Sequence, residues 1–180
     1  MREIIFRAKE YRVPFQGETE EERIKNAPWV YGDLVACDEG FAQHAILQEK
    51  MGDKGDYEYD IFGVEKYALV EEKTIGQFSG KYDRFGNRIF EGDIVFLRQE
   101  NDYRQDRFFQ FLALVVFSDG RFDYDFLPIG NDFLFEHLPP FSVTVVGNAF
   151  DTPNLLTTKY EHYVEREVWE KSGSFNKSII

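Results

Sequence analysis

Residues 74–95 read TIGQFSGKYDRFGNRIFEGDIV, and this stretch decides the fold class. It holds four glycines, a turn-rich centre and the start of an apolar run. Residues 74–78 are rich in β-forming side chains, which favours a short strand. Asp83, Gly86 and Asn87 supply the side-chain caps and the positive φ that tight turns need, so the segment around them is predicted as a loop.

The second half of the stretch predicts further strands. Residues 88–90 resume an extended chain, and Gly92 with Asp93 interrupts it before the apolar run at residues 94–97. A glycine there permits a bulge or sharp bend that aims the next strand, as in a small barrel. We therefore predict a mainly β fold of small barrel-like lobes, with an SH3-like barrel as one form, and a short C-terminal α-helix.

The order of the expected elements divides the chain into two lobes and an extension. Residues 1–72 are predicted as an N-terminal β lobe, residues 73–150 as a C-terminal barrel-like β lobe, and residues 151–180 as a helical extension. Thr19 and Glu22 match a capping box, which predicts two helical turns after it. Strands are expected at residues 3–8, 29–36, 41–47, 67–70, 108–117, 121–126 and 141–146.

The pieces of the central stretch, together with segments nearer both ends, resemble the YopX-like family of phage and prophage proteins. They are residues 76–80 (GQFSG), 83–87 (DRFGN) and 91–95 (EGDIV), and outside the stretch residues 1–7, 31–34, 146–148 and 153–156. One piece alone is weak, but several in order over residues 1–156 are specific as a set. The resemblance implies a phage setting and a β-rich fold, and it implies no particular reaction.

The composition indicates a folded, acidic protein. The 180 residues are 43% hydrophobic and 17% aromatic, which is enough for a core. The formal net charge is -12, so we expect neither direct nucleic-acid binding nor attraction to an acidic membrane surface. Cys37 is the one cysteine and cannot form an internal disulfide, and no leader or long apolar span is recognised. We expect a cytoplasmic protein of the host cell.

No pattern typical of an active site is found. Asp123 and Asp125 share one face of an expected strand, where the alternatives are a cation site and a solvated face paired with Arg121. The histidines have no partner at metal-ligand spacing, so no metal and no cofactor are assigned. Asp33 and Asp93 follow glycines and are interpreted as turn caps rather than catalytic acids. We predict that the protein is not an enzyme.

Basic and aromatic side chains in the central loop form the candidate interaction site. They are Lys81, Tyr82, Arg84 and Phe85. Exposed rings beside cations can stack on a base or a peptide. The competing interpretation is that one or both rings fold back onto the barrel.

A second candidate surface lies on a helix predicted at residues 159–171. Four apolar or aromatic side chains fall on one face of this helix, and Trp169 lies on the other side. The four are Tyr160, Tyr163, Val164 and Val168. We predict that a second copy of the chain covers this face in a homo-oligomer, and the alternative is that the helix packs on its own barrel.

Three hypotheses of function follow from these features. The leading one is a non-enzymatic binding or assembly module of phage origin, with a host or phage protein as its partner. The second is an acidic decoy that occupies a basic host nucleic-acid-binding protein. The third is an unrecognised hydrolase whose catalytic residues come from distant segments.

Overall fold

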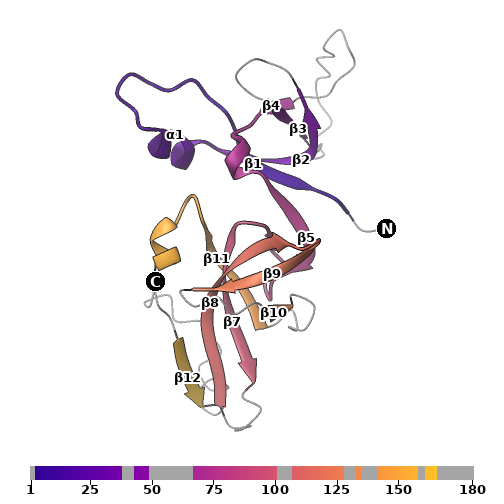
Figure 1. The fold of residues 1–180 in the computed structure, drawn as a ribbon, viewed down its shortest axis with the longest axis vertical. Helices are drawn as coiled ribbons and strands as arrows, with labels where there is room; N and C mark the ends of the chain where they lie inside the picture. Colours follow the sequence, from indigo (N-terminus) through magenta and orange to yellow (C-terminus); the bar gives the residue numbers. More distant parts are fainter. Residues whose placement is uncertain are drawn as a thin grey trace. The chain divides into compact units, whose positions relative to one another are not determined.

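The computed structural model describes residues 3–37, 43–48, 67–100, 107–127, 133–134, 142–157 and 161–165. These residues form mainly β structure, in two antiparallel sheets with one α-helix (Figure 1). The chain divides into two units. The first unit comprises Met1–Lys81 and Arg88–Gly92, and the second comprises Tyr82–Asn87 and Asp93–Ile180.

The sheet of the first unit has six strands in the order β4-β3-β2-β1-β5-β6. Their bounds are Phe6–Lys9 (β1), Trp29–Ala36 (β2), His44–Gln48 (β3), Tyr67–Leu69 (β4), Gly76–Tyr82 (β5) and Arg88–Phe90 (β6). A cluster of small and branched apolar side chains forms the core of this sheet, namely Ala8, Val30, Ile46, Ala68 and Val70. Strands β1 to β4 overlap the segments in which strands were predicted from the apolar pattern of the sequence.

Helix α1, Glu20–Asn26, begins at the predicted capping box, which is confirmed. The Thr19 side-chain oxygen accepts a hydrogen bond from the Glu22 N–H, and the Glu22 carboxylate accepts one from the Thr19 N–H. At the other end, the buried Lys9 ammonium donates to the Ala27 carbonyl at 2.8 Å, where the helix dipole favours a cation. Among the described residues, no helix has the length and apolar character needed to cross a membrane.

The sheet of the second unit has the order β10-β9-β8-β7-β11, and β12 pairs with β8 beside this path. The bounds are Asp93–Glu100 (β7), Arg107–Ser118 (β8), Arg121–Phe126 (β9), Phe133–Leu134 (β10), Val143–Asn148 (β11) and Glu161–Glu165 (β12). One edge of β8 pairs with β7, while its other edge pairs first with β12 and then with β9.

Strand β8 is the centre of the second unit, as its apolar sequence predicted. Phe111, Leu112 and Ala113 are consecutive and all buried, so both faces of the strand are covered. Asp119 and Gly120 both have positive φ, which makes the two-residue turn that joins β8 to β9. The predicted hairpin is therefore confirmed.

Neither sheet closes into a barrel within the described residues. The strands at the ends of each path, β4 and β6 in one sheet and β10 and β11 in the other, do not pair with each other. The predicted barrel-like lobes, including the SH3-like form, are thus replaced by two open sheets. The units also divide the chain elsewhere than at residue 72, because β5 pairs with β1 and brings residues 76–81 into the first unit.

The two Gly-Asp pairs that precede apolar runs do not occupy equivalent places. Gly32 lies inside β2 and is followed by an exposed Asp33. Gly92 has a φ of 80° in the turn before β7, and Asp93 after it is buried. The two pairs therefore lie in different local settings, one inside a strand and one in a turn.

The helix predicted at residues 159–171 is wrong where the structure describes it. Glu161–Glu165 form β12, which runs antiparallel to β8, and only the short 3-10 helix Pro153–Thr157 (η4) lies just before it. A strand does not have the 3.6-residue period on which the predicted helical stripe rests. The other residues of the predicted surface, Tyr160, Val168 and Trp169, lie outside the described residues.

Candidate binding loop

The predicted interaction loop is a tight turn organised by one buried carboxylate, that of Asp83. Its Oδ1 accepts the backbone N–H groups of Phe85 at 2.8 Å and Asn87 at 2.9 Å. Its Oδ2 accepts the Asn87 side-chain amide at 3.0 Å, and Gly86 provides the positive φ, 83°, that the turn needs. Asp83 is only 4% exposed. The turn predicted from Asp83, Gly86 and Asn87 is confirmed.

Two long-range hydrogen bonds hold this loop on the edge of β11. The Val145 N–H donates to Asp83 Oδ2 at 3.2 Å, and the Arg84 N–H donates to the Val143 carbonyl at 3.1 Å. Strand β11 pairs with β7 along its other edge. The loop thus covers part of an edge that would otherwise present unpaired backbone groups.

The electrostatics of Asp83 favour its charged form. Burial acts to raise the pKa of Asp83, but the hydrogen bonds from Asn87, Val145 and Phe85 outweigh burial, so the pKa lies below the usual aspartate value. The carboxylate is therefore ionised at neutral pH, and its hydrogen bonds to Phe85, Asn87 and Val145 are charge-assisted. Such hydrogen bonds are stronger than neutral ones, so they stabilise this conformation of the loop.

The candidate side chains of this loop are presented to solvent. Tyr82 is 44% exposed and Phe85 is 63% exposed, so both rings reach solvent. The Arg84 guanidinium lies over the Phe85 ring, 4.9 Å from its centroid, in a cation–π contact. Lys81 is exposed as well, but it and Tyr82 are the last residues of β5 rather than part of the turn. We call Lys81, Tyr82, Arg84 and Phe85 the binding loop.

The carboxylate pair on β9 is arranged differently from the prediction. The Arg121 Nε donates to Asp123 Oδ2 at 2.8 Å, which confirms the predicted pairing. Asp123 is only 3% exposed, however, so its predicted place on a solvated face is wrong. No group of three or more His, Cys, Asp or Glu in the described parts of the chain is placed to hold a metal ion.

Comparison with known proteins identifies the family. The sequence model of the family described as YopX protein matches residues 24–157 of the chain. The chain belongs to the YopX family. Among solved structures, it is similar to the protein EF1440 from Enterococcus faecalis, with 21% sequence identity, a TM-score of 0.46, and coverage of 87% of this chain and 99% of that chain. No curated protein sequence matches it.

The binding loop lies inside the segment that matches the YopX family, and a second organised turn lies before that segment. In this second turn, residues 12–18, an ion pair between Arg12 and Glu18 closes a short loop with Phe15 at its centre. No role was predicted for this turn from the sequence. The signal that could have found it is an arginine and a glutamate flanking the run Val-Pro-Phe.

Proposed function

We propose that this YopX-family chain is a non-enzymatic binding or assembly module of phage origin that acts in the cytoplasm of the host cell. The observation that carries the proposal is the binding loop, in which a buried carboxylate fixes the backbone beneath an exposed, arginine-stacked Phe85. Its partner is a host or phage protein rather than nucleic acid, since the net charge of -12 opposes contact with phosphates.

The preorganisation of the loop supports binding rather than a purely structural role. Aromatic and arginine side chains supply most of the energy at the centre of protein interfaces. A loop that already holds its bound conformation loses less entropy when a partner arrives. Arg84 also offers a cation beside the ring, so an acidic partner surface with an apolar centre fits the loop best.

The test is a partner-binding comparison between two phenylalanine variants of the second unit. Proteins captured from host lysate by the full chain are identified and then titrated with Phe85→Ala and with Phe117→Ala, which removes an exposed phenylalanine of β8. We expect Phe85→Ala to weaken binding about tenfold or more while Phe117→Ala leaves it unchanged. Equal effects of the two variants, or no effect of Phe85→Ala, would contradict the proposal.

An acidic decoy for a basic host nucleic-acid-binding protein is the second candidate, and the net charge of -12 favours it. Its complexes are expected to dissociate as salt screens the charges. A complex anchored by Phe85 is expected to survive high salt. Capture at low and high ionic strength therefore separates the two functions.

Two further expectations are tested separately. An unrecognised hydrolase would hydrolyse generic ester, phosphate or peptide substrates faster than they hydrolyse in buffer alone. Such turnover would replace the binding proposal.

Self-association stays a prediction, although residues 161–165 form a strand rather than the helix on which that prediction was based. Light scattering of the full chain at micromolar concentration measures it.

A further inference from the structure

The first unit carries an exposed apolar turn. Val13 is 74% exposed and Phe15 is 73% exposed, and Pro14 between them is exposed too. Single exposed apolar residues are common on protein surfaces, but three in a row on one turn form a protruding apolar tip. We call Val13, Pro14 and Phe15 the apolar tip.

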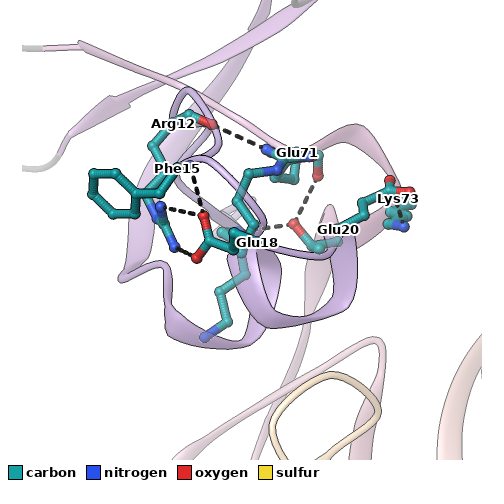
Figure 2. Close-up of polar contacts among 9 residues, drawn as sticks. Arg12, Phe15, Glu18, Glu20, Glu71 and Lys73 are labelled. Atoms are coloured by element: carbon teal, nitrogen blue, oxygen red, sulfur yellow. Dashed lines mark hydrogen bonds and ion pairs between the residues drawn. The ribbon is translucent and has the colours of Figure 1, made fainter.

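The apolar tip is held in place by hydrogen bonds at its base (Figure 2). Both terminal nitrogens of Arg12 donate to the Glu18 carboxylate, one of them at 2.9 Å. The Phe15 N–H donates to Glu18 Oε2 at 3.1 Å, and the Glu18 N–H donates back to the Phe15 carbonyl at 3.1 Å. The hydrogen bonds from Arg12 lower the pKa of Glu18 below its usual value, so the base of the turn stays ionised at neutral pH.

Helix α1 anchors this turn to the sheet of the first unit. The Arg23 guanidinium donates to the Arg12 carbonyl at 3.2 Å and forms a buried ion pair with Glu71. The Arg12 guanidinium lies 5.0 Å from the centroid of the Phe15 ring, which restricts the ring. Proline at position 14 restricts the backbone beside it. The apolar tip is therefore exposed and rigid at once, although its burial would be more favourable than its exposure.

The charge next to the apolar tip indicates which surface it fits. The first turn of α1, which follows directly, carries Glu20, Glu21 and Glu22, all exposed. Glu20 pairs with Lys73, whereas Glu21 and Glu22 form no ion pair with any described residue. A partner surface that covers the apolar tip would have these carboxylates at its edge. Basic side chains at the edge of that partner surface would complement their charge.

We propose that the apolar tip inserts into an apolar pocket with a basic rim on a protein partner. This site lies before the segment that matches the family, whereas the binding loop lies inside that segment, so the two sites are distinct. The two sites also differ in charge. The binding loop offers cations beside its ring, while the apolar tip offers carboxylates.

A photo-cross-linker at the tip finds the partner. The full chain carrying Phe15→p-benzoylphenylalanine is irradiated in bacterial cells, beside a control with the same substitution at Tyr67, an exposed aromatic residue of the first unit. We expect a cross-linked protein specific to position 15, which is identified by mass spectrometry and purified. A cross-link to a second copy, a cross-link within one chain, or the same products from position 67 would overturn the proposal.

Titration of that purified protein then decides the chemistry of the site. We expect Phe15→Ala to weaken its binding about tenfold or more. Glu21→Gln should weaken binding by a smaller factor, and only at low salt. Melting temperatures should change little, because both side chains are exposed and Glu21→Gln removes a charge at the start of α1 without reversing it. The control is Tyr67→Ala, which removes another exposed aromatic ring of the first unit and is expected to bind normally. Unchanged binding of Phe15→Ala, or equal loss in Tyr67→Ala, would overturn the proposal.

Discussion

At the scale of single residues, Asp83 has the largest predicted effect on the binding loop. Replacing Asp83 with alanine leaves the N–H groups of Phe85, Asn87 and Val145 without their acceptor. We expect Asp83→Ala to lower the free energy of unfolding by about 1–3 kcal/mol, measured by urea denaturation. The exposed Asp33→Ala is the control and should change the free energy by less than about 0.5 kcal/mol. Equal losses in both would show that the hydrogen bonds of Asp83 add no stability.

Asp83 also predicts a dependence of stability on pH. Its pKa is lower in the folded chain than in the unfolded chain, so the folded state binds fewer protons. The contribution of Asp83 is then complete above about pH 4 and is lost as the pH falls through the folded pKa. We expect the difference in unfolding free energy between the natural chain and Asp83→Ala to shrink from pH 6 to pH 2.5. A constant difference over this range would contradict the ionised state.

The sequence predicts this site only as far as its contacts are local. The turn at Asp83, Gly86 and Asn87 is set within four residues, so turn chemistry alone predicts it. The hydrogen bond from Val145 joins residues 62 positions apart, and no local pattern reports such a contact. The aromatic residues of the loop were therefore predicted, while their orientation was not.

At the scale of elements, the pairing of β2 with β3 requires a glycine at position 32. A Cβ on Gly32 would lie 1.8 Å from the Leu47 carbonyl oxygen, and the φ of Gly32 is 152°. We expect Gly32→Ala to lower the free energy of unfolding by more than about 3 kcal/mol, because the strands must separate to accommodate the methyl group. Gly120→Ala is the control, since its Cβ meets nothing within 4 Å, and should cost about 1–2 kcal/mol for its positive φ. Similar losses in the two variants would show that backbone strain, and not the close contact with Leu47, causes the loss of stability in Gly32→Ala.

The start of β7 gives a second prediction at this scale. Gly92 has a φ of 80°, which a β-branched residue adopts only with strain, and Asp93 is buried. We expect Gly92→Val and Asp93→Ala to lower the melting temperature in circular dichroism, and any loss of partner binding to follow from unfolding. A variant that keeps its melting temperature but loses a partner would show that these residues form a binding site.

The error at residues 161–165 has a physical cause. Thr158 and Glu161 match a capping box, and tyrosine and valine at the following positions suit a helix face. The same residues also suit a strand, because tyrosine and valine favour β structure. The first half of β8 offers an edge for pairing, and that tertiary contact decides the outcome. Local sequence cannot report an unpaired edge elsewhere in the chain.

At the scale of the whole molecule, the sequence predicts the β class and leaves the sheet architecture open. Apolar periodicity and turn residues place most strands, including the central β8 and its hairpin with β9. Closure into a barrel depends on whether the end strands pair, and such pairing joins residues far apart in sequence. The boundary between units depends on the same kind of contact, since β5 joins the first sheet by pairing with β1.

The position of β12 changes what truncation of the chain should do. A chain ending at Thr157 lacks β12, so the β8 backbone opposite it, residues 107–111, loses its pairing partner. An unpaired edge lowers stability and is a template for pairing with another chain. We therefore expect this chain to melt about 5 °C lower or more and to associate in light scattering. A chain ending at Glu165 retains β12 and should behave like the full chain. The opposite result would be a stable, monomeric shorter chain and an oligomeric full chain. It would show that the C-terminal segment mediates self-association, and that pairing with β8 is not its main role.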